Sequence, residues 1–222
     1  MASEIICIID RSGSMRSMSQ EAIGGFNQFL KDQKAIPDDS CKFTLILFDH
    51  EYSTVYNAVD IQDVSELNDQ TYIPRGTTAL FDAMGRALDD AIDRIQREYT
   101  EKPRVAVMIM TDGQENASKD YKKDRLEKLV EELKSDGWQF VFMSSDLNSF
   151  NADLNTMAVG TMSLGYDSSA KGYTAAYYAA SNSINAYRTG GVVAKGAVLL
   201  ADDGSKKKLK IKDKDVVDAK NK

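Results

Sequence analysis

The chain contains little of the side chain that most often transfers protons in enzymes. A single histidine, His50, occurs among its 222 residues. Catalysis by a histidine-activated nucleophile or by a histidine general base is therefore disfavoured. We expect His50 to be an exposed residue of a short hairpin.

Cysteine is nearly as scarce. Cys7 and Cys41 are the only two, and each lies in or at the start of an apolar, strand-like run. Because the chain shows no export signal, we expect both thiols to be buried and reduced. A disulfide between them is the alternative.

Long apolar runs and a phosphate-binding loop are missing as well. No stretch approaches the roughly 18 uncharged apolar residues that a membrane helix requires. The N-terminus lacks a basic region, and Asp10-Arg11 interrupts its apolar run, so no secretory signal is predicted and we expect a cytoplasmic protein. The pattern G-x-x-x-x-G-K is absent, so an associated ATPase activity would reside on another chain.

The charge is acidic overall and unevenly distributed. The net charge is −6, and residues 189–222 carry nine lysines and five aspartates, or +4, which leaves −10 for residues 1–188. This division predicts a domain over residues 1–188 and a basic, flexible tail over 189–222, with one small strand or docked segment around 197–200. An acidic body disfavours nucleic acid as the main partner; the alternative is that the tail lysines bind nucleic acid or another anionic surface.

Apolar runs typical of buried strands alternate with segments of helical periodicity. The strand-like runs are 4–9, 41–48, 52–57, 104–110, 138–144 and 157–164, and helical spacing begins near residue 19 and recurs over 79–97, 120–135 and 170–187. Asp49-His50-Glu51 looks like a hairpin turn, so the strand after it is expected to be antiparallel. The predicted fold class is α/β: a Rossmann-like, open, mostly parallel sheet with one antiparallel edge strand and helices on both faces. Gly24-Gly25 within the first helix indicates close packing or a kink.

Oxygen-bearing side chains cluster where the first and fourth strands are expected to end. Asp10, Ser12 and Ser14 follow the first strand, Asp112 follows the fourth, and Gly76-Thr77-Thr78 precedes the helix between them. Open α/β sheets bind ligands at the carboxyl ends of their strands. Because every donor is an oxygen, the set suits a hard cation such as Mg²⁺ or Ca²⁺. Only two donors are carboxylates, so a divalent ion held there would still attract an anionic group.

These segments resemble those of a known family. Asp10-Arg11-Ser12-Gly13-Ser14 resembles the D-x-S-x-S motif of von Willebrand factor A (vWA) domains, the metal-ion-dependent adhesion site (MIDAS). Gly76–Ala83 resembles the family's glycine–threonine segment, although Arg75-Gly76-Thr77 stands where Gly-Gly-Thr is common, and Met110–Gly113 resembles its T-D-G segment. The three follow the family's order across residues 4–188. The metal ligands that the resemblance implies are Asp10, Ser12, Ser14, Thr78 and Asp112, with Thr77 as the alternative to Thr78.

The resemblance is closest to small, intracellular, free-standing vWA proteins of bacteria and their viruses. It implies a metal-dependent protein-binding module without enzymatic activity, in which bound Mg²⁺ (Mn²⁺ or Ca²⁺ as alternatives) is completed by an Asp or Glu of a protein partner. One alternative is a non-catalytic subunit of an ATPase-coupled or viral assembly with a structural metal. A minor alternative is a Mg²⁺-dependent phosphatase with Asp10 as nucleophile, which Ser12 disfavours because a second acid is needed there.

Residues near the site and in the last helix have less specific interpretations. Glu115 and Asn116 follow the T-D-G segment, where we expect solvated polar residues, and contact with a partner is the alternative. Four tyrosines at roughly helical spacing are predicted to pack in the core rather than to bind a ligand. They are Tyr173, Tyr177, Tyr178 and Tyr187.

Overall fold

The computed structural model describes residues 2–37, 40–144, 157, 161–166, 170–191, 196–200 and 206–208, without the side chains of residue 170 and of the last two stretches. The elements are β1 (Ser3–Asp10), η1 (Gly13–Met18), α1 (Ser19–Lys34), β2 (Cys41–Phe48), β3 (Tyr52–Asp60), η2 (Ile61–Asp63), α2 (Leu80–Glu98), β4 (Arg104–Thr111), α3 (Lys123–Ser135), β5 (Gln139–Ser144), β6 (Met162–Tyr166), α5 (Ala170–Arg188), β7 (Gly196–Leu200) and β8 (Lys206–Lys208). The described strands form one sheet in the order β3-β2-β1-β4-β5-β6-β7-β8.

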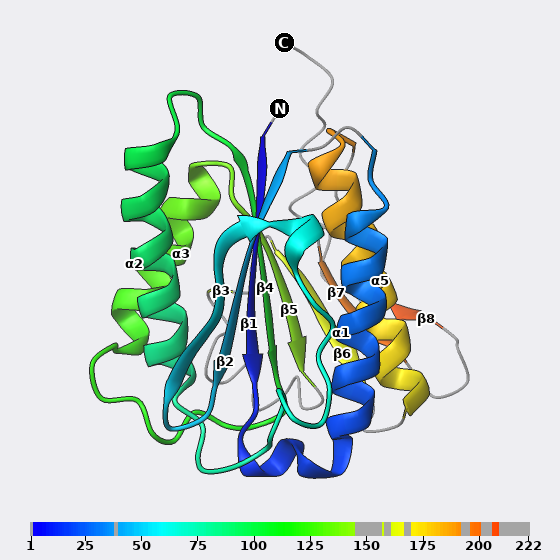
Figure 1. Cartoon of the computed structure of the whole chain (residues 1–222). Helices are drawn as coiled ribbons and strands as arrows, with labels where there is room; N and C mark the ends of the chain where they lie inside the picture. Colours follow the sequence, from blue (N-terminus) through cyan, green and yellow to red (C-terminus); the bar gives the residue numbers. More distant parts are fainter. Residues whose placement is uncertain are drawn as a thin grey trace.

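The sheet is mostly parallel, as the sequence predicted (Figure 1). β1 pairs in parallel with β2 and β4, and the parallel arrangement continues through β5 and β6 to β7. β3 pairs antiparallel with β2, which confirms the predicted edge strand, and a second antiparallel pair, β7–β8, lies at the other edge. The strand or docked segment predicted around 197–200 is therefore a strand that extends the sheet, while residues 192–195, 201–205 and 209–222 of the predicted tail lie outside the described part.

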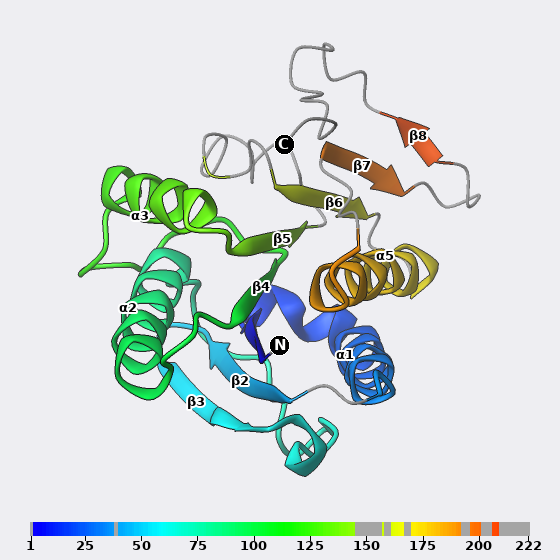
Figure 2. The same cartoon turned by 90° about the horizontal axis from the view of Figure 1, so that it is seen from above.

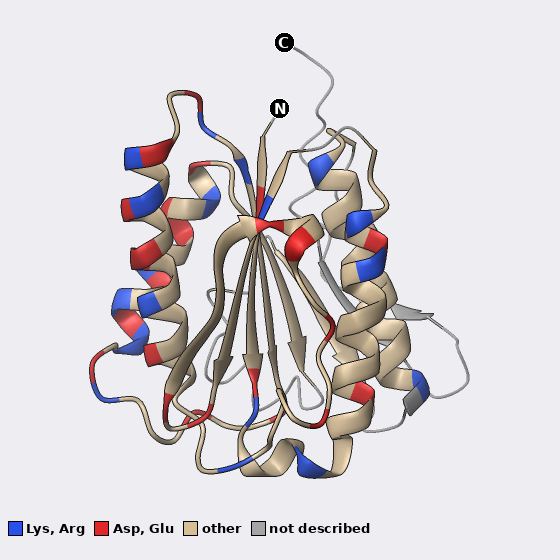
Figure 3. Ribbon diagram, in the orientation of Figure 1, with Lys and Arg blue, Asp and Glu red and all other residues tan. Residues whose placement is uncertain are grey.

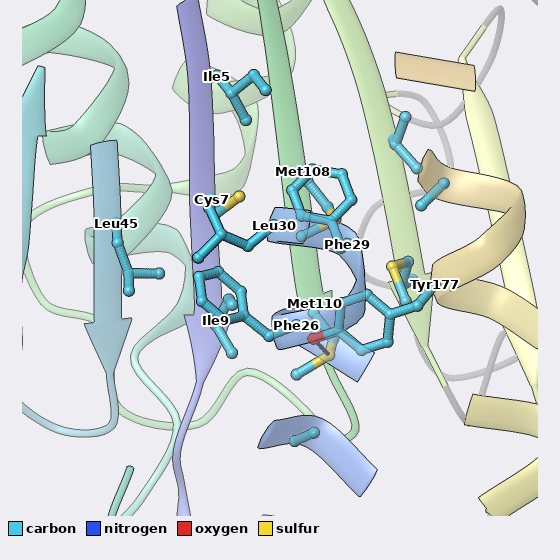
Figure 4. Close-up of a cluster of buried hydrophobic side chains, with 14 of the residues drawn as sticks. Ile5, Cys7, Ile9, Phe26, Phe29, Leu30, Leu45, Met108, Met110 and Tyr177 are labelled. Carbon is cyan, nitrogen blue, oxygen red and sulfur yellow. Dashed lines mark hydrogen bonds between the residues drawn. The ribbon is translucent and has the colours of Figure 1, made fainter. Parts of the chain in front are cut away.

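Helices cover both faces of the sheet, with α1 and α5 on one side and α2 and α3 on the other (Figure 2). Successive side chains of a strand point to opposite faces, so β1 contributes side chains to both layers of the hydrophobic core. Ile5, Cys7 and Ile9 pack with α1 and α5, whereas Ile6 and Ile8 pack with α2 and α3. Figure 4 shows the first of these layers, in which the labelled β1 side chains face Phe26, Phe29 and Leu30 of α1. This two-sided burial explains why the first strand is a nearly continuous apolar run.

Close packing between α1 and α5 depends on one of the two adjacent glycines. A Cβ at Gly25 would collide with the ring of Tyr177, whereas a Cβ at Gly24 would meet nothing within 4 Å. The Tyr177 hydroxyl lies 2.9 Å from Met110 Sδ, beside which it is drawn in Figure 4. The predicted close packing is thus confirmed at Gly25, and Tyr173 and Tyr177 are core residues as expected, whereas Tyr178 is exposed.

Some boundaries differ from the sequence prediction for identifiable reasons. α3 begins at Lys123 rather than near Asp120, because the Asp82 carboxylate accepts the backbone N–H groups of residues 119, 120 and 121 and holds them outside the helix. Met157 is helical, and the strand predicted from there begins only at Met162. Cys7 and Cys41 are buried thiols that are not joined by a disulfide, which confirms that prediction.

Charged residues are distributed unevenly over the fold (Figure 3). Strands β1 to β6 carry charged residues only near their ends, and Lys, Arg, Asp and Glu gather on the outer faces of the helices and on the loops at both ends of the sheet. The short edge strand β8 differs, because it consists of three lysines, Lys206–Lys208. None of the helices in the described part of the chain combines the length and the apolar content that a bilayer crossing requires.

Candidate metal centre

The candidate site lies at the carboxyl ends of β1 and β4, at the lower edge in Figure 1. These strands are neighbours in the sheet, so Asp10 and Thr111 end side by side. Two backbone hydrogen bonds join the loop before α2 to the loop after β1, from Gly13 N to Gly76 O (3.1 Å) and from Arg75 N to Arg11 O (2.8 Å), and a third joins it to the loop after β4, from Asn116 N to Thr78 O (3.0 Å). Three segments that are distant in the sequence therefore meet at one edge, as expected.

Hydroxyl groups link the two carboxylates of the site. Ser14 Oγ donates to Asp112 Oδ1 at 2.8 Å, and Ser14 Oγ lies 3.1 Å from Ser12 Oγ. Asp10 accepts from Ser12 N at Oδ1 and from Thr111 Oγ1 at Oδ2, both at 2.6 Å. The structure thus brings the predicted serines and aspartates together rather than pointing them apart.

Thr78, rather than Thr77, lies beside Asp10. Thr78 is buried and Thr77 is exposed. A Cβ added at Gly113 would lie 2.7 Å from Thr78 Oγ1 and 3.4 Å from Asp10 Oδ2, so both oxygens face the space that this glycine leaves free. Thr78 completes the predicted set of oxygen donors, and Thr77 does not join it.

Burial makes the negative charge of this set costly. Asp10 is inaccessible to solvent, and burial raises its pKa from 3.8 to about 6, although hydrogen bonds from Thr111 and Ser12 lower it and the charge of Asp112 raises it further. Burial likewise raises the pKa of Asp112, against the hydrogen bond from Ser14. Neither carboxylate takes part in a salt bridge within the described part of the chain.

The donor set fits a hard divalent cation. Two carboxylates without a cationic partner in the described part of the chain lie among three hydroxyl groups, and all five groups offer oxygen atoms as donors. No group of three or more His, Cys, Asp or Glu side chains capable of holding a metal occurs among the residues with described positions, so a softer, nitrogen- or sulfur-rich site finds no support there.

A sequence profile places the chain in a family. The profile described as "von Willebrand factor type A domain" matches residues 4–168, and this range contains all three segments of the site. The chain belongs to the von Willebrand factor type A family. No curated protein matches the vWA chain in a sequence comparison.

Solved structures with the same fold include proteins of bacterial pili. The PilB minor pilin from Streptococcus sanguinis has a TM-score of 0.60 at 11% identity and covers 85% of this chain and 62% of its own. The vWF domain of the type V pili tip protein Mfa5 from Porphyromonas gingivalis has a TM-score of 0.58 at 11% identity, with coverages of 88% and 98%. A von Willebrand factor type A protein from Catenulispora acidiphila has a TM-score of 0.56 at 11% identity, with coverages of 82% and 42%. At these identities the likeness shows the vWA fold alone, and the chain spans less than two thirds of the first and third of these proteins.

The sequence indicated only some of the residues that hold the proposed ligands in place. The buried Tyr72 donates its hydroxyl to Asp10 O at 2.6 Å, and it lies in a polar connection that carries no periodic signal. Asn116 accepts from Thr78 N through its side chain (3.0 Å) and donates its own N–H to Thr78 O (3.0 Å). Glu115 accepts from Phe81 N at the start of α2 and from Ser118 N in its own loop. Glu115 and Asn116 therefore fix the loop that carries Thr78.

His50 lies in the β2–β3 hairpin with 48% of its side chain exposed, as predicted. Its Nδ1 is 3.0 Å from Asp49 Oδ1, a contact that the sequence did not indicate. Gly76 has φ of +67°, and a Cβ there would collide with the His50 ring. The only histidine of the vWA chain thus packs against a site loop.

Proposed function

We propose that this vWA domain is a metal-dependent protein-binding module. Asp10, Ser12, Ser14, Thr78 and Asp112 would hold Mg²⁺ as a MIDAS, and an Asp or Glu of a protein partner would complete the shell of the ion. The observation that supports this most is the pair formed by the buried Asp10 and the half-buried Asp112, which hydroxyl groups contact and which no lysine or arginine of the described part of the chain neutralises. Buried charges are ordinarily paired or bound to a metal.

The exposure of some of the donors supports the proposal that a carboxylate of a partner can reach the ion. Ser14 is exposed and Asp112 is half-buried, so the set opens to solvent on their side. Only two of the donors are carboxylates and the others are neutral, so a divalent ion held there would still attract an anionic group. Mg²⁺ ordinarily keeps several waters in such a site. When bound, the ion supplies a concentrated positive charge that favours exchange of a water for a carboxylate.

The choice of ion and the non-enzymatic role belong to the same proposal. Oxygen donors favour Mg²⁺, with Mn²⁺ and Ca²⁺ as alternatives. The phosphatase alternative would use Asp10 as a nucleophile, but Asp10 is inaccessible to solvent and Ser12 stands where the second acid is needed. The motifs around Asp10 and Asp112 support an intracellular protein of bacterial or phage type.

Metal uptake is the first test. Isothermal titration of the full chain with Mg²⁺ should give one site per chain, and Asp10→Ala should abolish it. Glu21→Ala, which removes a surface carboxylate at the start of α1, serves as the control and should leave binding unchanged. Unchanged uptake by Asp10→Ala would remove the proposed site.

The partner's carboxylate needs a separate test. With Mn²⁺ as the probe ion, the capped peptide acetyl-Gly-Gly-Asp-Gly-Gly-amide should displace bound water and lower the water-proton relaxation rate, whereas acetyl-Gly-Gly-Asn-Gly-Gly-amide, which has no carboxylate, should not. Equal effects of the two peptides would argue against carboxylate completion. For a natural partner once known, binding that survives chelation would favour the alternative of an assembly subunit with a structural metal.

A further inference from the structure

We infer that Asp49, which is not one of the proposed ligands, positions the two loops that carry them, a role that rests on the proposed metal site. Asp49 directly follows β2, the strand beside β1, and is completely buried. Its surroundings differ from those of Asp10 and Asp112, because it contacts two arginines from two different loops.

The Asp49 carboxylate joins those loops through one oxygen. Asp49 Oδ2 accepts from Arg11 Nε at 2.9 Å and from Arg75 Nε at 3.0 Å. Arg11 stands between Asp10 and Ser12, and Arg75 precedes Thr78 by three residues. A single buried oxygen therefore fixes the segment with the first ligands relative to the segment with the threonine.

The remaining polar atoms of Asp49 fix its own orientation. Oδ1 accepts from Glu51 N at 2.7 Å and lies 3.0 Å from His50 Nδ1. The Asp49 carbonyl oxygen accepts from Ala79 N at 2.9 Å, and Ala79 directly follows Thr78. Because its side chain and its backbone both form hydrogen bonds, Asp49 has a fixed orientation and can position the two loops.

Without the carboxylate, the loops would lose the buried anion that both of them contact and would keep their weaker links, among them a hydrogen bond from Arg16 Nη2 to Pro74 O at 3.5 Å. Two backbone hydrogen bonds, Arg75 N to Arg11 O and Gly13 N to Gly76 O, link them directly. The guanidinium groups of Arg11 and Arg75, which now share one anion, would repel each other. Arg75 also pairs with Glu51, so it would keep a partner while Arg11 would lose its salt bridge. We expect the distance between Ser12 and Thr78 to become less well defined.

The test compares two buried carboxylates that each pair with arginine. Asp49→Asn keeps the size of the side chain and removes its charge. Glu4→Gln does the same at the opposite end of β1, where Glu4 pairs with Arg94. Mn²⁺ affinity by isothermal titration should fall by about tenfold or more for Asp49→Asn, in the range seen when residues that orient metal ligands are lost. Glu4→Gln should bind Mn²⁺ within about twofold of the wild type, since it has no contact with the site, although both variants lower the melting temperature of the metal-free protein.

The outcomes separate the positioning role from the metal site itself. An absence of Mn²⁺ uptake by the wild type would refute the proposed function. Uptake by the wild type with equal affinity in Asp49→Asn would overturn the positioning role alone, and so would equal losses in Asp49→Asn and Glu4→Gln, because affinity would then follow stability.

A milder pair of variants serves if Asp49→Asn does not fold. Arg75, whose side chain is 46% exposed, can be changed with little effect on the core. Arg75→Gln should weaken Mn²⁺ binding severalfold, and Arg75→Lys should recover part of the loss by retaining the charge. Wild-type affinity in Arg75→Gln would overturn the inference.

Discussion

Each end of β1 carries a buried acidic residue, and the two residues differ in the groups that pair with their carboxylates. At the amino end, Glu4 is 1% exposed and pairs with Arg94, which also donates to Asn57 Oδ1 at 3.2 Å. At the carboxyl end, Asp10 is equally buried but receives only hydroxyl and amide donors. The Glu4 charge is balanced by an internal cation, although Glu4 Oε1 and Arg94 Nε are buried without a hydrogen-bond partner in the described part of the chain, whereas a buried carboxylate that lacks an internal cation is stabilised by a cation from outside.

The surroundings of the two acids extend the contrast. Near the amino end, the buried Arg188 donates through Nη1 to Gln33 O and Gln33 Oε1, each at 2.9 Å, so its charge also has internal acceptors. At the carboxyl end, Ser14 is exposed and hydrogen bonded to Asp112. Within β1, internal pairing of the buried acid therefore distinguishes a structural end from an end suited to binding, whereas Asp49, which follows β2 and pairs with Arg11 and Arg75, is not one of the proposed ligands.

The largest expected effect comes from neutralising each acid in turn. Glu4→Gln leaves Arg94 buried without its anion and should lower the free energy of unfolding by about 3 kcal/mol. Asp10→Asn, in the presence of a chelator, should cost little or even stabilise, because it removes an unpaired buried charge. Urea unfolding with and without Mg²⁺ measures both. Equal destabilisation by both substitutions in chelator would contradict the proposed difference between the two ends of β1.

Saturating Mg²⁺ at one hundred times Kd should stabilise the wild type and Glu4→Gln by about 2.7 kcal/mol and leave Asp10→Asn unchanged.

The stability of the metal-free protein should depend on pH because Asp10 is buried without a cationic partner in the described part of the chain. The folded pKa of Asp10 is raised from 3.8 to about 6, so the folded state binds this proton more tightly than the unfolded state does. Its contribution is therefore stabilising at pH values below the unfolded pKa and is lost as pH rises through about 6. Two pKa units correspond to about 3 kcal/mol, so wild-type stability relative to Asp10→Asn should fall by an amount of that order between pH 4 and 7 in chelator. Parallel stability curves for the two proteins would contradict the raised pKa.

The sequence predicted the alternating sheet and the proposed ligands because both depend on local patterns. An apolar run followed by Asp10, Ser12 and Ser14 identifies the end of a strand, and the parallel arrangement brings such ends together. The supporting residues depend instead on pairs far apart in the chain. Tyr72 contacts a residue 62 positions away, and Asp49 contacts residues 38 and 26 positions away. Asp49-His50-Glu51 has the composition of an ordinary turn, which hides the role of its first residue.

A smaller effect should separate the two threonines. Thr78 Oγ1 faces the same space as Asp10 Oδ2, whereas Thr77 is exposed. Thr78→Ala should weaken Mn²⁺ binding by about tenfold, comparable to losing one oriented group around a metal. Thr77→Ala, the control next to it in the chain, should bind Mn²⁺ like the wild type. A larger loss in Thr77→Ala would reverse the assignment of the ligand.

The smallest expected effect compares two tyrosine hydroxyls, one at each end of the sheet. Tyr72 donates to Asp10 O at 2.6 Å beside the site, and Tyr187 donates to Gly137 O at 2.7 Å just before β5. Each substitution by Phe should cost about 1 kcal/mol of unfolding free energy, with the larger cost at the buried Tyr72.

Only Tyr72→Phe should also change metal affinity. The loss should remain below the about tenfold typical of a group that orients a ligand side chain, because the Tyr72 hydroxyl contacts the backbone of Asp10 rather than its carboxylate. Isothermal titration of both variants with Mn²⁺ measures the difference. If Tyr187→Phe weakened binding as much as Tyr72→Phe, stability at either end of the sheet would control the site, and the division between a structural and a binding end would not hold.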